Sequence, residues 1–507
     1  MSVGLQGMKG HKVAVEANVR VDREQFVIIG LPDASIKESK ERVLSCLHAM
    51  NLEIDMKKIT IHLSPSDIRK SGTGFDCAML LAVMQEVLDK PLPIDDSTCV
   101  IAALSLNCEL MPFHGMIPAI QQAISLGFKR ILIPSIDVSF LRHVKNVEIV
   151  PLPDMHALIS YLKGSRLPDY LITPKLAIVA PAPFDEQTST DFSSIRGHQD
   201  AKRAMEICAA GGHHLLIMGP PGCGKSMLSD AFHTILPDLS LDEMVELYGI
   251  YHLARENRGM SPRPPYRHPH HSASSVSLIG GGTFPKPGEI SLAHKGVLFL
   301  DELGEFSRKT LDMLRQPMEA GEVTISRVRQ SVTYPSNFIL IAATNPCPCG
   351  YVGSNERYCT CSSRQVANYR LKVSGPLLDR MDFVLALHSV GLKEDSEAET
   401  SASIRGRTTR AREMQRARFG KEWLNGFVPF QLLDETCGLS KAQIEFIQQI
   451  CFEKKWSNRT QTKLIRIART IADLEGSKFI TESALLESVK WKSMAPKLHI
   501  SSVLVGE

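Results

Sequence analysis

Residues 1–165 alternate between two kinds of apolar pattern. Short runs rich in β-branched and other apolar residues fall at residues 12–21, 25–30, 58–63, 99–106, 130–135 and 147–152. Between them, apolar residues recur at helical spacing in residues 34–50, 75–88 and 117–127. Because strand patterns alternate with helix patterns, we expect a mixed α/β domain over residues 1–165.

A second α/β region follows a proline-rich stretch. Residues 163–187 (KGSRLPDYLITPKLAIVAPAPFDEQ) have little periodicity, which predicts a linker. We assign this linker to residues 166–192, between the two α/β regions. Apolar runs at residues 215–218, 297–300 and 338–343 then predict buried strands of a parallel sheet, in a core over residues 193–395. The pattern beyond about residue 425 is helical, which predicts a helical lid over residues 396–507.

The strongest chemical signal is GPPGCGKS at residues 219–226, which fits the phosphate-binding pattern G-x-x-x-x-G-K-[ST]. An apolar strand precedes it and a helical pattern at residues 225–236 follows it, the context in which this loop cradles phosphates. Lys225 is expected to reach the β- and γ-phosphates, and the Ser226 hydroxyl to hold Mg²⁺. The predicted ATP-binding residues of the loop are Gly219, Pro220, Pro221, Gly222, Cys223, Gly224, Lys225, Ser226 and Met227.

Two carboxylates end the next buried strand. VLFLDE at residues 297–302 ends on Asp301 and Glu302, and a parallel strand delivers such groups to the sheet edge where the phosphates lie. Asp301 is expected to bind Mg²⁺ with Ser226, and Glu302 to orient and deprotonate the attacking water. The alternative is a structural acid pair that caps a helix. A third strand, FILIAATN, ends on the polar Asn345.

Four cysteines follow Asn345 in a C-x-C-x₉-C-x-C arrangement: Cys347, Cys349, Cys359 and Cys361. Four thiolates suit a tetrahedral Zn²⁺ site in a reducing compartment. With all ligand positions filled, such a zinc would brace the fold and would not catalyse. Free thiols and a redox pair are the alternatives.

Three further segments carry candidate chemistry. Residues 322–334 alternate well enough for a hairpin, with Arg327 and Arg329 near its turn as candidate DNA phosphate contacts; a solvated hairpin is the alternative. The dense basic stretch at residues 404–418 is either a solvated face or a contact with nucleic acid or another subunit. In the insertion at residues 263–296, polar packing is more expected than a metal site for its four histidines, His268, His270, His271 and His294.

Composition narrows the class of protein. Hydrophobic residues make up 43% and charged residues 22% of 507, and no apolar run approaches the roughly 18 residues of a membrane span. The N-terminal segment lacks a signal-peptide pattern, so we expect a cytoplasmic protein with reduced thiols. The net charge of +3 neither demands nor excludes nucleic acid, so any basic binding surface must be local.

Several phrases carry a family resemblance: GLPDASIKESKERV, HLSPSDIRKSGTGFD and GFKRILIPS, together with the P-loop and the acidic strand end. The chain resembles the ComM (YifB) family of Mg-chelatase-like AAA+ ATPases. This implies that residues 1–165 have the fold of the Lon proteolytic domain. Gly74 stands where the Lon serine is expected and Ile117 roughly where its lysine is, so the resemblance implies an inactive protease, with Ser71 and Thr73 as turn residues.

The same resemblance assigns roles in the ATPase core. Asn345 is the expected sensor 1, which holds the catalytic water or the γ-phosphate. Residues 195–199 (IRGHQ) are assigned to the adenine pocket, with simple helix capping as the alternative. Residues 263–296 correspond to the helix-2 insert and residues 322–334 to the pre-sensor-1 hairpin, both of which project into the channel of a ring.

Arginines near the end of the core and in the lid complete the implied site. Arg380, in GPLLDRMD, is the expected arginine finger for a neighbouring subunit; an intramolecular pair with Asp379 or Asp382 is the alternative. A sensor-2 arginine is expected in the helix at residues 457–476, where Arg466 is favoured and Arg459 is close behind.

The function implied by the resemblance is a ring-forming ATPase, most often a hexamer, that uses ATP and Mg²⁺ to move along single-stranded or branched DNA. Branch migration in homologous recombination or natural transformation is the family role. The alternatives are a Mg-chelatase-like or protein-remodelling motor and a nucleotide-switched binding module.

Overall fold

The computed structural model describes residues 1–141, 144, 146–166, 190–256, 258–282, 285–327, 330–354, 357–388, 399–420 and 423–496. The chain divides into two compact units. Unit 1 comprises Met1–Ala182, Leu241–Met260 and Ser326–Thr333, and unit 2 comprises the remaining segments. Most of the predicted linker, and the predicted end of the core at residue 395, lie outside the described residues, so the domain boundaries stay predictions.

Unit 1 contains two main sheets. The four-stranded sheet has the order β1-β2-β4-β3, in which only β3 and β4 are parallel, and the second sheet pairs β5, β8 and β9 in parallel. The strands are β1 (Ser2–Gln6), β2 (Lys9–Val21), β3 (Gln25–Ile29), β4 (Lys57–Ser64), β5 (Thr98–Val100), β6 (Ala103–Leu104), β7 (Leu110–Met111), β8 (Arg130–Pro134) and β9 (Glu148–Leu152). The helices are α1 (Ala34–Ala49), α2 (Asp76–Val87), α3 (Met116–Ser125) and α4 (Met155–Leu162). Every strand and helix predicted for residues 1–165 has a counterpart here, whereas β1, β7 and α4 were not predicted.

Helix α8 (Leu241–Ala254) belongs to unit 1, although it follows the P-loop helix in sequence. Val245 of α8 is buried in the same apolar cluster as Ile117 and Ile120 of α3. The backbone N–H of Gly115 donates to Nδ1 of His252, at 2.9 Å. The N-terminal unit is therefore completed by a helix from within the predicted ATPase core.

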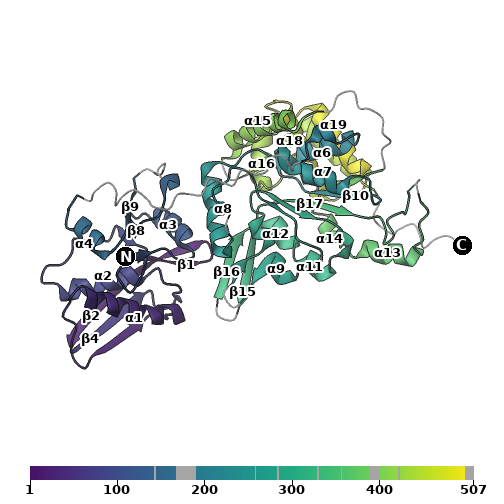
Figure 1. The fold of residues 1–507 in the computed structure, drawn as a ribbon. Coiled ribbons are helices and arrows are strands. Elements are labelled where there is room, and N and C mark those ends of the chain that lie inside the picture. Colours follow the sequence, from purple (N-terminus) through teal and green to yellow (C-terminus); the bar gives the residue numbers. More distant parts are fainter. Residues whose placement is uncertain are drawn as a thin grey trace. The chain divides into compact units, whose positions relative to one another are not determined.

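Unit 2 is built on a five-stranded sheet with the order β11-β14-β17-β10-β18, and all its strand pairs are parallel. Its strands are β10 (Leu215–Met218), β11 (Tyr266–Arg267), β14 (Val297–Leu300), β17 (Ile339–Thr344) and β18 (Phe383–Ala386). The middle strands β10, β14 and β17 are buried along their whole length, as expected for a parallel sheet covered on both faces. The predicted mixed α/β fold with a parallel sheet is thus confirmed (Figure 1).

Unit 2 also contains helices and short strands outside its five-stranded sheet. They are α6 (Gln199–Gly211), α7 (Lys225–Phe232), α9 (Ser275–Ile279), β12 (Gly280–Gly281), β13 (Lys286–Pro287), α10 (Glu289–Leu292), α11 (Arg308–Asp312), α12 (Arg315–Ala320), α13 (Ser363–Leu371) and α14 (Gly375–Leu378). A separate hairpin pairs β15 (Glu322–Arg327) with β16 (Gln330–Pro335). Within the insertion at residues 263–296, β11 adds an edge strand to the central sheet, and β12 and β13 form a hairpin.

The C-terminal lid is helical, as predicted. It consists of α15 (Ser401–Phe419), α16 (Phe430–Cys437), α17 (Lys441–Glu453), α18 (Asn458–Leu474) and α19 (Glu482–Met494). Helices α15, α18 and α19 gather around α6, as Figure 1 shows. Across the described residues, no helix is both long and apolar enough to cross a bilayer.

A buried carboxylate joins the first residues of two core strands. Oδ2 of Asp382 accepts the backbone N–H of His214 at 2.9 Å, and the N–H of Asp382 donates to the carbonyl of His214 at 3.0 Å. Nδ1 of His213 lies 3.6 Å from the same carboxylate. Burial raises the pKa of Asp382, but the neighbouring His213 and the charge of Lys463 outweigh burial, so the net shift is downward. Lys463, on α18, donates to the carbonyl of Met381 at 2.6 Å and so ties the lid to this junction.

The neighbouring His214 generates a pH prediction. Burial lowers its pKa to about 4, and its Nδ1 accepts the N–H of Leu340 at 3.0 Å. Because the folded-state pKa lies below the unfolded value of 6.5, stability is fully present above pH 6.5 and is lost as pH falls toward 4, by about 3 kcal/mol. Denaturant unfolding followed by tryptophan fluorescence measures this loss, since Trp423, Trp456 and Trp491 all lie in the lid.

The control variant is His214→Asn, which keeps an acceptor for the Leu340 N–H but has no imidazole to protonate. Its stability should depend less steeply on pH between 6.5 and 4. Equal slopes in both proteins would contradict the assignment to His214.

Candidate functional site

The P-loop joins the buried strand β10 to helix α7. Gly222 and Gly224 both adopt positive φ, at 81° and 88°, a conformation that residues with a Cβ rarely take. A Cβ on Gly219 would lie 2.9 Å from the carbonyl oxygen of Leu387. The glycines of the motif are therefore required by this backbone path, which leads into the N-terminus of α7.

The loop contacts two other predicted site residues, Asn345 through Lys225 and Asp301 through Ser226. Lys225 Nζ donates to the carbonyls of Gly219 and Pro220, each at 2.8 Å, and to Oδ1 of Asn345 at 3.2 Å. Asn345 directly follows β17, the strand that neighbours β10. Burial lowers the pKa of Lys225, while the nearby carboxylates of Asp301 and Glu302 oppose that shift.

Ser226 and Asp301 form a pair of hard oxygen ligands. Ser226 Oγ donates to Oδ2 of Asp301 at 3.0 Å, across the gap between α7 and the end of β14. Oδ1 of Asp301 accepts the backbone N–H of Glu302 at 2.8 Å. A hydroxyl and a carboxylate this close fit the protein ligands that Mg²⁺ takes alongside water and phosphate oxygens.

Glu302 has a partner that the sequence did not indicate. Its backbone is left-handed, with φ of 49°, and its Oε2 lies 3.1 Å from Nδ1 of His271. His271 was considered only as one of four histidines in the insertion. Of these, His294 is buried and accepts the N–H of Asn337, and His268 packs against the ring of Phe299. Among the described residues, these histidines belong to no group of three or more potential metal ligands.

The segment assigned to the adenine pocket lies beside the P-loop. Ile195 is buried, and His198 begins α6 with a left-handed backbone, φ 56°. Its ring faces the loop, because Nε2 would be 3.8 Å from a Cβ on Gly224. Burial lowers the pKa of His198, which favours a neutral imidazole there.

Arg380 pairs with neither of the aspartates considered from the sequence. Its Nη2 donates to Oε2 of Glu319 at 2.5 Å, and its Nη1 donates to the carbonyl of Pro376 at 2.7 Å. Arg459, in the first turn of α18, donates to the other oxygen of Glu319 at 3.4 Å. Arg380 and Arg459 therefore meet at one exposed carboxylate.

Arg466 lies in a different environment. Its Nη2 donates to the carbonyl of Val428 at 2.6 Å, and its Nε is buried without a hydrogen-bond partner. Burial lowers its pKa. The third arginine of the helix, Arg469, is fully buried and pairs with Asp473. The structure thus separates the two sensor-2 candidates: Arg459 joins Arg380 at Glu319, and the half-buried Arg466 bonds to the Val428 carbonyl of the lid.

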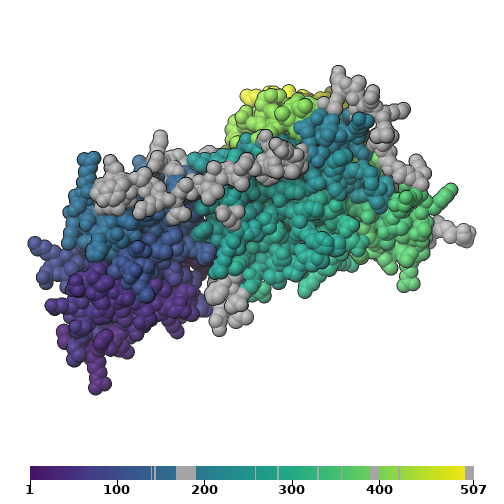
Figure 2. Space-filling model, viewed as in Figure 1, coloured from purple at the N-terminus to yellow at the C-terminus, as the bar shows by residue number. Residues whose placement is uncertain are grey.

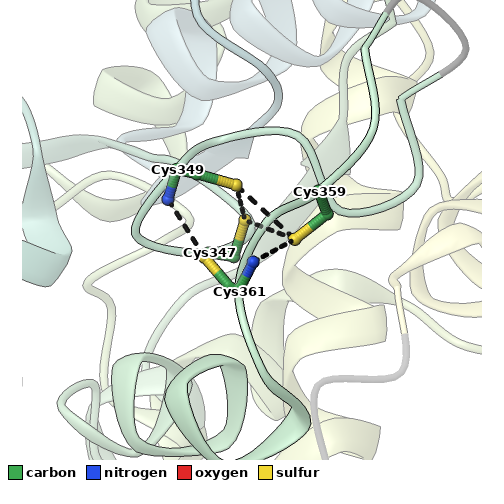
Figure 3. Close-up of side chains that lie close together, drawn as sticks. All are labelled: Cys347, Cys349, Cys359 and Cys361. Atoms are coloured by element: carbon green, nitrogen blue, oxygen red, sulfur yellow. Dashed lines mark hydrogen bonds between the residues drawn. The ribbon is translucent and has the colours of Figure 1, made fainter.

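The four predicted zinc ligands come together (Figure 3). All four Sγ atoms lie within 4.8 Å of one another, and three pairs are 3.4, 3.5 and 3.7 Å apart. A tetrahedral site with Zn–S bonds of about 2.3 Å places its sulfurs about 3.8 Å apart. Backbone N–H groups of Cys349, Val352 and Cys361 point at ligand sulfurs, each at 3.4 Å, which stabilises thiolates. The cluster fits a structural Zn²⁺.

The cysteine loop also supports the nucleotide loop. A Cβ on Gly350 would lie 2.5 Å from Cδ of Pro221, so the two loops are in close contact. Arg370, on α13, donates to the carbonyl of Pro346, between Asn345 and the first cysteine, at 3.3 Å. The light-green segment that holds the cysteines and α13 reaches the surface of unit 2 (Figure 2).

Two other predicted segments, the hairpin and the basic stretch, have different outcomes. Arg327 is exposed at the end of β15, while Arg329 lies outside the described residues. In the basic stretch, several arginines of α15 make intramolecular contacts: Arg405 with Asp238, Arg407 with Glu206 and Glu399, Arg412 with the carbonyl of Ala209, and Arg418 with Asp473. Internal pairing thus accounts for much of a charge run that had been weighed as a solvated or binding face.

The position expected for a Lon nucleophile has no room for a side chain. A Cβ on Gly74 would lie 2.5 Å from the ring of Phe113. Ile117, at the position expected for the lysine, is buried in an apolar cluster. The inactive protease fold stays a prediction.

Comparison with known proteins agrees with this geometry. The family described as magnesium chelatase, subunit ChlI, matches residues 191–395; related models, described as subunit ChlI of Mg-chelatase and the ChlI C-terminal part, match residues 15–137 and 398–492. Protein YifB of Escherichia coli is 34% identical over 98% of this chain and 97% of its own length. Competence protein ComM of Haemophilus influenzae is 34% identical over 97% of both chains. The 38 kDa magnesium-chelatase subunit of Rhodobacter capsulatus is 25% identical over 31% of this chain and 50% of its own. The chain belongs to the ComM/YifB family of Mg-chelatase-like AAA+ proteins.

Proposed function

We propose that the chain is a ring-forming, Mg²⁺-dependent ATPase that couples ATP hydrolysis to movement on DNA. Membership of the Mg-chelatase-like AAA+ family implies ATPase activity. The observation that carries the proposal is the convergence of three strand ends: Lys225 contacts Asn345 at 3.2 Å, and Ser226 contacts Asp301 at 3.0 Å. These are the groups needed to hold a triphosphate, its metal and a water at one place.

Each group then has one task. Lys225 and the loop N–H groups, from Gly219 to Met227, bind the phosphates, and Ser226 with Asp301 holds Mg²⁺. The metal, when bound, neutralises charge that develops on the phosphate oxygens. Glu302 orients the attacking water and accepts its proton, and Asn345 holds that water or the γ-phosphate.

Arg380 is proposed to complete the site of a neighbouring subunit, so that a ring, in this proposal a hexamer, is the active form. A cation at the γ-phosphate stabilises charge in the transition state. Arg459 is the better sensor-2 candidate, because it shares the carboxylate of Glu319 with Arg380, whereas Arg466 bonds to Val428 in the lid.

DNA is the proposed track. A relative of near full length bears the name competence protein, which supports a role in natural transformation, with branch migration during recombination as the activity. The hairpin that ends on the exposed Arg327 offers a cation to the phosphate backbone, and Arg329 follows two residues later in sequence. A motor that acts on a protein partner is the second candidate, favoured by the match to magnesium chelatase.

The cysteine cluster is proposed to hold one structural Zn²⁺ through Cys347, Cys349, Cys359 and Cys361. The spacing of the sulfurs and their N–H donors support this assignment. Because the loop touches Pro221 and begins two residues after Asn345, the metal would brace two parts of the nucleotide site at once.

Replacement of the base should separate binding from hydrolysis. Glu302→Gln should still bind ATP but lower kcat by about a hundredfold or more, because an amide cannot accept the proton of the attacking water. Steady-state ATPase rates, with fluorescent-nucleotide binding measured in parallel, check this. The control is Glu305→Gln, an exposed carboxylate three residues away, which should turn over normally. Normal turnover by Glu302→Gln would show that another group is the base.

DNA should stimulate the ATPase. Arg327→Ala/Arg329→Ala should raise the half-maximal DNA concentration about tenfold and reduce the salt dependence by about two phosphate contacts. Titrations with single-stranded, duplex and branched DNA at several salt concentrations test this, with Arg308→Ala as a control for the loss of an exposed arginine elsewhere. No stimulation by any DNA would refute the translocase. Wild-type stimulation of the double variant would refute only the hairpin contact.

Purified protein should contain about one zinc per chain. Cys359→Ser should lose most of the metal and unfold at a lower temperature, because one thiolate ligand is missing. Elemental analysis with thermal unfolding measures both effects. Cys451→Ser, on α17, is the matched control and should keep its zinc. Zinc-free protein with four intact thiols would contradict the assignment.

A further inference from the structure

Three charged side chains from separate segments meet on one face of unit 2. Glu319 lies near the end of α12, Arg380 follows α14, and Arg459 is in the first turn of α18. Oε2 of Glu319 accepts Nη2 of Arg380 at 2.5 Å, and Oε1 accepts Nη2 of Arg459 at 3.4 Å. One carboxylate therefore holds a core arginine and a lid arginine, one on each oxygen.

Side-chain contacts fix helix α12, which carries Glu319, against helix α14. Arg315 of α12 donates to Oγ of Ser374, the N-cap of α14, at 3.4 Å and pairs with Asp312 at 3.2 Å. Ser374 Oγ in turn donates to Asp312 at 2.8 Å. Since these contacts lock α12 to α14, Glu319 is held at a defined place relative to the segment that carries Arg380.

Stability alone is a weak explanation for the cluster. The side chains of Glu319 and Arg459 are 56% and 64% exposed, and exposed ion pairs contribute little to folding. Arg380 is more enclosed, at 15%, and a second bond, to the carbonyl of Pro376, fixes its direction. Each arginine gives one terminal nitrogen to Glu319, and its remaining N–H groups include donors of the kind that phosphate oxygens accept.

We propose that Glu319 is a positioning residue that aligns Arg380 and Arg459 as one cationic pair for the γ-phosphate of ATP on the neighbouring subunit. The inference rests on the proposed role of Arg380 in trans. An arginine on a long side chain must lose rotamer freedom to reach a transition state, and a carboxylate that orders it beforehand removes much of that cost. Two arginines against one carboxylate leave a net charge of +1 facing the phosphate.

The test compares variants of the full-length chain under conditions where assembly is verified by light scattering. Glu319→Gln should lower kcat about ten- to a hundredfold, with the KM for ATP and the oligomeric state unchanged, because the amide orders the arginines poorly. Glu319→Asp should restore part of kcat. Glu322→Gln removes an exposed carboxylate three residues further along the chain and should match wild type.

A mutant cycle distinguishes positioning from a structural role. Glu319→Gln/Arg380→Ala/Arg459→Ala should be no slower than Arg380→Ala/Arg459→Ala, since Glu319 acts through those two arginines. Additive losses, a wild-type or raised kcat in Glu319→Gln, or loss of assembly would each overturn the inference. Wild-type turnover by Arg380→Ala would instead overturn the proposed finger itself, whatever Glu319 does. Partial recovery when Glu319→Gln chains are mixed with Lys225→Ala chains, which keep an intact arginine pair, would support action between subunits.

Discussion

One buried carboxylate, that of Asp382, fixes how two central strands of the ATPase unit begin. Asp382 bonds to the backbone of His214 and lies beside His213, at the point where β10 and β18 begin. A charge so deep in the protein is tolerated only because several donors surround it. Two residues before it stands Arg380, and the residues after His214 lead through β10 into the P-loop. The strand that delivers the phosphate-binding loop and the segment that carries the finger thus share one anchor, and Lys463 connects the lid to the same point.

Local signals in the sequence were sufficient for much of this structure. Residues 219–226 identify a phosphate loop because few other backbones need that pattern of glycines, and apolar runs at 215–218, 297–300 and 338–343 predict strands that are buried on both faces. The four cysteines could be assigned to one metal site because they lie close together in the sequence. Asp301 and Asn345 could be proposed because each stands at the end of an apolar strand pattern, and the family resemblance assigns Asn345 as sensor 1.

Contacts between distant segments were beyond sequence reasoning. The pairs His271–Glu302 and Glu319–Arg380 join residues that lie far apart in the sequence, and no periodicity indicates that their side chains meet. The edge strand β11 has only two residues, which is too short to show the alternation of apolar and polar side chains that indicates a strand. The basic run at residues 404–418 looked like a surface, yet several of its arginines are bound to acids and carbonyls elsewhere in the fold.

Helix α8 has a consequence for how the chain reaches its native state. Because residues 241–260 complete the N-terminal unit, the apolar cluster around α3 stays open until well after the P-loop has been synthesised. The two units therefore cannot mature strictly one after the other on the ribosome, as consecutive domains do. A fragment cut at the end of the predicted first domain would expose to water the apolar surface that Val245 covers. Such a fragment would be prone to aggregate.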